Sequence, residues 1–346
     1  IGTLLKQRGE LEEAEKLYRQ ALAIREELGN KSGTASMQNK LANVLSEQDE
    51  LKEARELLDQ SLSIREELGE KSNIASNLTS VGSLMQHQGN YKDAETHYNS
   101  SLIIRKELDV KPGISETLHD LGRLSMNKGE LDQADVLVRD AFEMRKKMGL
   151  VAAQASTMLC MGRLEVLKDN TTTAEQFFNQ LLDLIEPNTD IKVYIKTLLH
   201  LTSIYLDRDD IKKAEKTFDR SGIMKRKWQS PYLDAQIKAL KLRIVIKKKR
   251  DKRVVSKAFN ETVTAYDVLN AVPNIDEGPV AALHAAALYY QEVGDAQKVK
   301  DIAARIKENG HGLPPVLAKE IKVFLKNFSG NGKKKTTRKV EKKSAK

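Results

Sequence analysis

Residues 51–69 read LKEARELLDQSLSIREELG, and the same design returns before and after them at a fixed interval of 40 residues. One alanine recurs in six consecutive copies, and a second series of small residues keeps the same spacing. The alanines are Ala14, Ala54, Ala94, Ala134, Ala174 and Ala214, and the second series is Gly2, Ala42, Gly82, Gly122, Gly162 and Thr202. A fixed period of roughly 20 to 50 residues is typical of a solenoid. The sequence therefore predicts an array of stacked repeats.

Each repeat has the pattern of two helices. Leu41, Val44 and Leu45 follow the i, i+3, i+4 spacing of a helix that is buried on one side, and the stretch after Ala54 has the same spacing. A small residue is needed where two helices of a hairpin cross closely, so Gly82 and Ala94 mark a predicted crossing. Large side chains are expected to fill the space beside the crossings, and these are Tyr18, Leu58, Tyr98, Val138, Phe178 and Phe218.

Glycines and serines mark the expected boundaries between repeats. Gly29 and Gly69 follow the second helix of a repeat, where a residue with left-handed backbone geometry closes many helices. Ser32 and Ser72 come soon after and are expected to be the N-caps of the next helices.

These residues resemble the tetratricopeptide repeat family. The Leu121-Gly122 pair, the step from Ala94 to Tyr98 and the small Ser101 match its helix-turn-helix pattern. The period is 40 residues rather than 34, and leucine or methionine replaces the usual tryptophan. The longer period is similar to that of kinesin light chains, of scaffolds that bind spindle-orientation peptides, and of sensor arms in bacterial signalling NTPases and transcription regulators. The resemblance implies an all-α, right-handed solenoid of helix-turn-helix repeats.

The regularity of the repeats predicts four regions. Residues 1–228 form regular repeats, of which the first is truncated because Ile1 falls inside a helix, so we expect a piece of a longer protein. Residues 229–310 form degenerate helix pairs, and residues 311–328 form a capping helix. Residues 329–346 are a Lys-rich tail without apolar periodicity and are expected to be disordered.

Composition indicates a soluble, cytoplasmic type of protein. The single cysteine of the 346 residues, Cys160, cannot form an internal disulfide, and no apolar run reaches the roughly 20 residues of a membrane span. The net charge of +9 is uneven, because residues 1–220 carry a net negative charge and residues 221–346 a larger positive one. Such asymmetry suggests a basic region that can meet an anionic partner.

The sequence contains no constellation of catalytic residues. Its six histidines show no pair at metal-ligand spacing, and there is no Gly-rich loop of the type that holds nucleotide phosphates. Cys160 lies beside Met161 in a helical pattern, which is typical of a small buried apolar residue. We therefore expect a protein that is not an enzyme and that holds no cofactor or metal.

A binding groove is the leading functional hypothesis. The family resemblance implies that the first helix of each repeat lines a concave face and that two positions around the Leu-Gly pair point into it. These peptide-binding candidates are Asn39, Asn43, Thr79, Ser83, His119, Arg123, Arg163, Ser203 and Arg243. Arg123 and Arg163 occupy equivalent sites in consecutive repeats and could together hold an acidic, extended peptide. The alternative is that these polar side chains are merely solvated.

A basic cluster offers a different hypothesis. Lysines and arginines that could neutralise the phosphates of nucleic acid or another polyanion are Lys247, Lys248, Lys249, Arg250, Lys333, Lys334 and Lys335. No aromatic residues alternate with them as a stacking platform would require, so a solvated tail is the simpler interpretation. The sequence thus favours a protein-binding scaffold, with a sensor arm of a larger NTPase or transcription regulator as the alternative and nucleic-acid binding third. It leaves the oligomeric state open.

Overall fold

The computed structural model describes residues 1–7, 9–187, 190–225, 231–248, 254–255, 257–262, 264 and 297. These residues form helices joined by short turns and no β-strand. The helices are α1 (Gly2–Gln7), α2 (Leu11–Glu27), α3 (Lys31–Glu47), α4 (Leu51–Glu67), α5 (Lys71–His87), α6 (Tyr91–Glu107), α7 (Lys111–Lys128), α8 (Leu131–Lys147), α9 (Val151–Leu167), α10 (Thr171–Leu184), α11 (Ile191–Asp207), α12 (Ile211–Lys225) and α13 (Pro231–Lys247). The predicted capping helix and tail, residues 311–346, lie outside the described residues.

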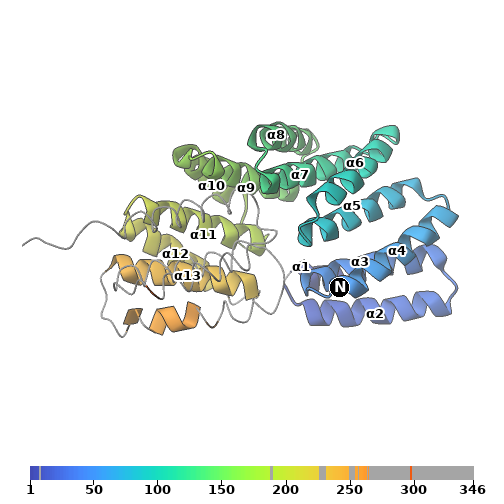
Figure 1. The fold of residues 1–346 in the computed structure, drawn as a ribbon, viewed down its shortest axis with the longest axis horizontal. Helices are drawn as coiled ribbons and strands as arrows, with labels where there is room; N and C mark the ends of the chain where they lie inside the picture. The colour runs from blue at the N-terminus through green and yellow to red at the C-terminus, as the bar shows by residue number, and fades with distance from the viewer. Residues whose placement is uncertain are drawn as a thin grey trace, which may run out of the picture.

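Consecutive helices form hairpins that stack into an arch with α7 and α8 near its crown (Figure 1). Each odd-numbered helix from α3 to α11 also packs against the next odd-numbered helix. The odd-numbered helices therefore form the inner side of the arch, whereas α6 and α8 lie outside α5 and α7 (Figure 1). The predicted all-α solenoid of helix-turn-helix repeats is confirmed.

The turns between repeats have the predicted glycine geometry but different N-caps. Gly29 and Gly69 have φ angles of 62° and 67°, in the left-handed region that closes a helix. A single extended residue then leads into the next helix, so the N-cap of α3 is Asn30, whose side chain accepts a hydrogen bond from the Gly33 amide at 2.8 Å. Ser32 and Ser72 already lie inside α3 and α5, and their prediction as N-caps was wrong.

Small residues do mark the crossings within the hairpins. The six alanines of the 40-residue series are completely buried. A Cβ atom added to Gly162 would lie 2.3 Å from Cε1 of Phe178, and one added to Gly82 would lie 2.8 Å from Cδ1 of Tyr98. The aromatic rings thus pack directly on the backbone of the opposite helix, which confirms the predicted crossing.

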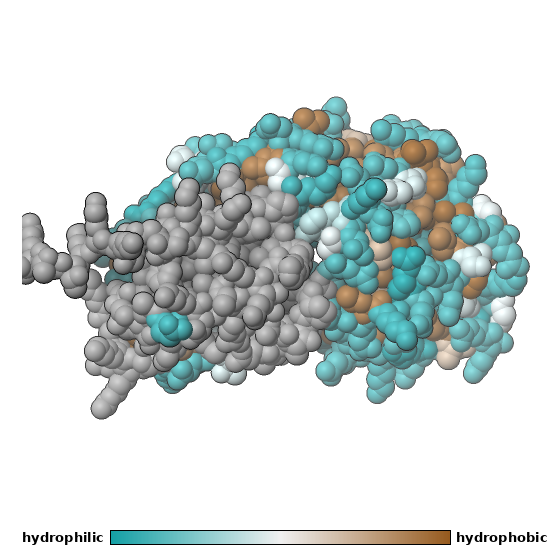
Figure 2. Space-filling view, in the orientation of Figure 1, coloured by the Kyte–Doolittle hydropathy of each residue, from teal (hydrophilic) through white to brown (hydrophobic). Residues whose placement is uncertain are grey.

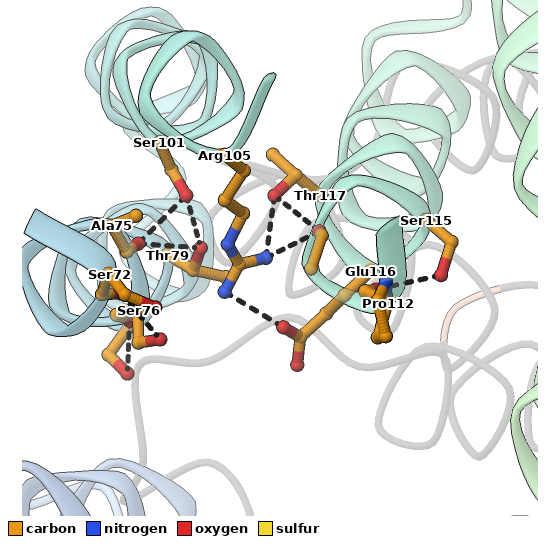
Figure 3. Close-up of polar contacts among 12 residues, drawn as sticks. Ser72, Ala75, Ser76, Thr79, Ser101, Arg105, Pro112, Ser115, Glu116 and Thr117 are labelled. Atoms are coloured by element: carbon orange, nitrogen blue, oxygen red, sulfur yellow. Dashed lines mark hydrogen bonds and ion pairs between the residues drawn. The ribbon is translucent and has the colours of Figure 1, made fainter. Parts of the chain in front are cut away.

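A buried arginine joins each of three repeats to the next. In Figure 3, Arg105 at the end of α6 reaches the first turns of α7. Its Nη1 donates to the carbonyl oxygen of Gly113 at 2.6 Å and to Oγ1 of Thr117 at 2.7 Å, and its Nη2 lies 2.9 Å from the Glu116 carboxylate. Arg65 and Arg145 occupy the equivalent positions and donate to the carbonyl oxygens of Asn73 and Ala153. All three side chains are about 5% exposed, so each is a clamp between repeats.

A buried serine adds a second bond at two of the repeats. Ser101 Oγ donates to the carbonyl oxygen of Ala75 at 2.8 Å and lies 2.9 Å from Thr79 Oγ1 (Figure 3). Ser61 makes the equivalent 2.8 Å bond to the carbonyl oxygen of Ala35. Ser61 and Ser101 are completely buried, and each hydroxyl group has a hydrogen-bond acceptor in the adjacent helix.

The turns within the hairpins are linked by a series of ion pairs. In each pair, a cation at the end of an odd-numbered helix meets a carboxylate near the start of the preceding even-numbered helix. The pairs are Lys128–Glu95 (2.9 Å), Lys168–Asp135 (3.2 Å), Arg208–Glu175 and Lys248–Glu215 (2.6 Å). We call this series the ion-pair edge of the solenoid.

The surface in Figure 2 is mostly hydrophilic, with smaller hydrophobic areas on the half of the molecule that contains α2 to α6. Within the described part of the chain, no helix combines the length and the apolar character that crossing a bilayer would require.

Candidate functional site

The candidate site is a row of side chains on the inner, odd-numbered helices. A 40-residue period returns to the same helical position in every repeat, so the row takes one residue from each of α3, α5, α7, α9, α11 and α13. Its members are Asn43, Ser83, Arg123, Arg163, Ser203 and Arg243. Ser83 and Arg123 are exposed, and the other four are half-buried. We call these six residues the inner row.

At its N-terminal end the inner row is tied into hydrogen bonds between α3 and α5. The Asn43 amide nitrogen lies 3.3 Å from Oδ1 of Asn39 and 3.2 Å from Oγ of Ser80. Ser80 Oγ also donates to Asn39 Oδ1 at 3.3 Å, while the buried Asn39 amide nitrogen has no hydrogen-bond partner in the structure. Asn39 and Asn43 therefore lie together, and through Ser80 they join two repeats.

Thr79 is half-buried and His119 is buried. Thr79 Oγ1 bonds to Ala75 and Ser101, and the His119 side chain is only 9% exposed. A step of four residues rotates a helical position by about 40° beyond a full turn, which here separates the buried His119 from the exposed Arg123. The side chain of Asp120, three residues before Arg123, is half-buried, whereas that of His119 is buried.

The centre of the inner row is electrostatically positive but contains one partly buried acid. The Arg123 side chain is 47% exposed, and its Nη1 lies 3.6 Å from Oδ1 of Asp120. Burial raises the pKa of the Asp120 carboxyl to about 6, although Arg123 opposes the shift. Burial, aided by the charges of Arg145, Arg123 and Arg163, holds the pKa of His119 well below its usual range. A protonated His119 is thus disfavoured, and the two guanidinium groups remain the cations of this centre.

Towards the C-terminal end, the predicted cations are engaged with nearby residues. Arg243 donates to Ser203 Oγ at 2.9 Å and pairs with Asp207 at 2.5 Å. Lys247 pairs with Asp209 at 2.7 Å, and Lys248 is the last member of the ion-pair edge. The ion-pair edge could have been predicted from the sequence, because its cations Lys128, Lys168, Arg208 and Lys248 follow the 40-residue period. The remaining polyanion-binding candidates, Lys249, Arg250, Lys333, Lys334 and Lys335, lie outside the described residues.

Cys160 lies in α9 and is 3% exposed, as its apolar context predicted. Its sulfur lies 3.3 Å from the Met126 sulfur, and burial raises the pKa of the thiol. Among the residues that the structure describes, no group of three His, Cys, Asp or Glu side chains is arranged to hold a metal ion.

Comparisons with known proteins agree with this repeat architecture. The family model described as "Tetratricopeptide repeat" matches residues 1–67 and 73–147. A search of curated proteins found no match.

Solved structures show the same fold. The chain is similar to a Rap protein complexed with competence and sporulation factor, at 13% identity and a TM-score of 0.65, over 88% of this chain and 86% of that one. The Rap conjugation gene regulator of plasmid pLS20, in complex with the Phr* peptide, matches at 13% identity and a TM-score of 0.61, over 85% and 77%. The apo quorum sensor NprR from B. thuringiensis matches at 12% identity and a TM-score of 0.59, over 89% and 82%.

Proposed function

We propose that this chain, whose residues 1–67 and 73–147 match the tetratricopeptide repeat family model, is a non-catalytic, cytoplasmic scaffold that binds an extended peptide or protein segment along its inner row. The observation that carries the proposal is the inner row itself. It is a line of polar side chains, one from each odd-numbered helix, on the side of the arch where those helices approach one another. An extended segment that runs across the helices could meet one such side chain in every repeat.

We propose that the bound segment carries acidic groups at the centre of the row. Arg123 and Arg163 belong to neighbouring helices, and a guanidinium group binds a carboxylate through two parallel hydrogen bonds. The contact of Arg123 with Asp120 is long at 3.6 Å, and almost half of the arginine side chain is open to solvent. A ligand carboxylate can therefore reach Arg123 without first breaking a short ion pair.

A second candidate is a regulatory arm whose peptide ligand controls an attached effector. The structural neighbours favour it, because they include a quorum sensor and a gene regulator in complex with a peptide. Both candidates use the same groove. They differ in whether peptide binding changes the activity of another domain, and coupling of the chain to such a domain would distinguish them.

A selection from a phage library of linear peptides tests the proposal. We expect the peptides enriched on the wild-type chain to contain Asp or Glu and to bind more weakly as salt is added. The R123E/R163E variant should lower their affinity by at least about ten-fold, because one charge-assisted hydrogen bond contributes roughly 1.5–3 kcal/mol. Fluorescence polarisation with labelled peptides measures this change.

The matched control is R55E/R139E. Arg55 and Arg139 lie on outer helices, are exposed to a similar degree as Arg123, and each pairs with a carboxylate one turn away on its own helix. This variant has the same charge change and should keep wild-type affinity. Peptides without acidic residues, or equal losses in both variants, would contradict the assignment of the inner row.

A further inference from the structure

The centre of the inner row holds a carboxylate beside the arginine that is proposed to bind an acidic ligand. Oδ1 of Asp120 lies 3.6 Å from Nη1 of Arg123, one turn along α7. The Asp120 side chain is 16% exposed, against 47% for Arg123. The carboxylate is thus the more buried member of the pair, and the exposed part of the guanidinium group is left for a ligand.

Two further arginines act on Asp120 from neighbouring helices, but both already have partners. Arg105 of α6 and Arg145 of α8 lower the pKa of the Asp120 carboxyl, whereas Glu116 of α7 raises it. Arg105 and Arg145 are buried clamps, which donate to backbone carbonyl oxygens of the next repeat. Neither can turn towards Asp120 without breaking a junction between repeats. Arg123 is the arginine of this group that can exchange Asp120 for a ligand.

The remaining titratable groups near Asp120 stay uncharged around neutral pH. Burial raises the pKa of Tyr98 on α6 and of Cys160 on α9, and the nearby Asp120 adds to both shifts. Burial also holds the pKa of His119 well below its usual range. Of these four groups, Asp120 is the one whose charge changes between about pH 5.5 and about pH 7.5, because burial raises the pKa of its carboxyl to about 6.

We propose that Asp120 is a specificity-determining residue of the inner row: its carboxylate competes with an acidic ligand for Arg123, and the ligand binds best when Asp120 has taken up a proton. This inference rests on the proposed function, because it needs an acidic segment in the groove. A ligand oxygen that accepts a hydrogen bond of about 2.9 Å from Nη1 of Arg123 would lie within about 6.5 Å of Asp120 Oδ1. Two carboxylates at such a distance repel each other, and a proton on the more buried one removes the repulsion.

The competition couples ligand binding to pH. The carboxylates of a solvated peptide have pKa values near about 4 and remain ionised at about pH 5.5, where Asp120 is mostly neutral. An acidic peptide should therefore bind more tightly as pH falls from about 7.5 to about 5.5. By linkage, binding of the peptide near neutral pH should also draw a proton onto the protein.

The experiment uses a fluorescein-labelled peptide from the phage selection that contains Asp or Glu and no His. Fluorescence polarisation at constant ionic strength should show that the wild type binds it at least about three-fold more tightly at about pH 5.5 than at about pH 7.5, the factor expected for two charges at this separation in a water-like medium. D120N, which has no carboxylate, should bind more tightly than the wild type at the higher pH, by at least about three-fold, and should lose most of the pH dependence.

The matched control is D59N. Asp59 lies on the outer helix α4 and pairs with Arg55, one turn away, at 2.8 Å. D59N removes the same charge from an equivalent pair and should keep both the affinity and the pH dependence of the wild type. Isothermal titration calorimetry in two buffers of different ionisation enthalpy adds a measurement that needs no variant: the wild type should take up protons on binding, and D120N should take up fewer.

The outcomes separate this inference from the proposed function. Binding of the acidic peptide that is independent of pH, or a D120N variant with the pH profile and proton uptake of the wild type, would overturn the role of Asp120 and leave the groove in place. A chain that binds no acidic peptide at any of these pH values would overturn both.

Discussion

At the scale of single residues, the buried arginines carry much of the coupling between repeats. A guanidinium group loses its hydration on burial and must recover it through hydrogen bonds. Arg105 does so with two bonds to α7 and one ion pair to Glu116. Arg25 belongs to the same 40-residue series but remains exposed. Arg25 is therefore a control for the effect of burial on the contribution of this arginine to stability.

We predict that R105A lowers the free energy of unfolding by about 2–4 kcal/mol, because it removes two hydrogen bonds to α7 and the packing of a buried side chain. R25A should change it by less than about 0.5 kcal/mol, as is usual for an exposed side chain. Urea denaturation followed by circular dichroism measures both. Equal effects of the two variants would show that burial does not decide the contribution of this position.

A second prediction at this scale concerns Asp120 and pH. The pKa of its carboxyl is raised to about 6 in the folded protein, so the folded state holds the proton at pH values where the unfolded state has released it. Its contribution to stability is therefore fully present below the unfolded pKa of about 4 and is lost as pH rises through about 6.

We expect D120N to become more stable relative to the wild type by about 1–3 kcal/mol between about pH 4 and about pH 7.5, since the amide carries no charge to bury. Thermal or urea melts of both proteins at a series of pH values measure the difference, in which titrations common to both cancel. A difference that is independent of pH would contradict the raised pKa of Asp120.

At the scale of helices, the crossings within hairpins depend on the pairing of a small and a large residue. Gly162 lies against Phe178, whereas the equivalent pair in an earlier repeat is Ala42 and Leu58. We predict that G162A destabilises the protein by about 1–3 kcal/mol, because its methyl group would overlap the phenyl ring.

The double variant G162A/F178L copies the earlier pair and should recover part of this loss. G222A is the control, because a Cβ atom there meets nothing within 4 Å, and it should be neutral or stabilising. Differential scanning calorimetry of the wild type, G162A, F178L, G162A/F178L and G222A decides the question. If the two substitutions at the crossing were simply additive, the ring would not be the source of the strain.

The sequence predicted the hairpins and crossings well, because a period of 40 residues repeats the same packing constraint and a small residue in each copy indicates where two helices approach closely. The sequence did not indicate how deeply each groove candidate is buried, because burial depends on the rotation of a helix by a fraction of a turn. His119 is buried, and Thr79 is hydrogen-bonded to Ser101 of the adjacent helix, although both follow the spacing of the other candidates. The clamps were missed for another reason. Arginine is exposed by default, and only the recurrence of Arg65, Arg105 and Arg145 pointed to a shared structural role.

At the scale of the whole molecule, the helices that the structure describes pack mainly against those of the same and the adjacent repeats, so stability should be local rather than uniform. We predict that G162A accelerates amide hydrogen exchange mainly in α8 to α11 and leaves α3 and α4 almost unchanged. Exchange measured by mass spectrometry with peptide resolution tests this. A uniform acceleration along the chain would show that the solenoid unfolds as one cooperative unit.

The ion-pair edge and the buried contacts between repeats differ in how they respond to salt. The ion-pair edge is held by partly exposed charges, which added salt screens, whereas the apolar contacts and buried clamps between repeats are insensitive to it. Added salt should therefore loosen this edge at the four junctions that carry the ion pairs and leave the buried contacts in place. Small openings at these junctions would add up along the array. We therefore expect ionic strength to change the curvature of the solenoid slightly and, with it, the length of segment that the groove can span.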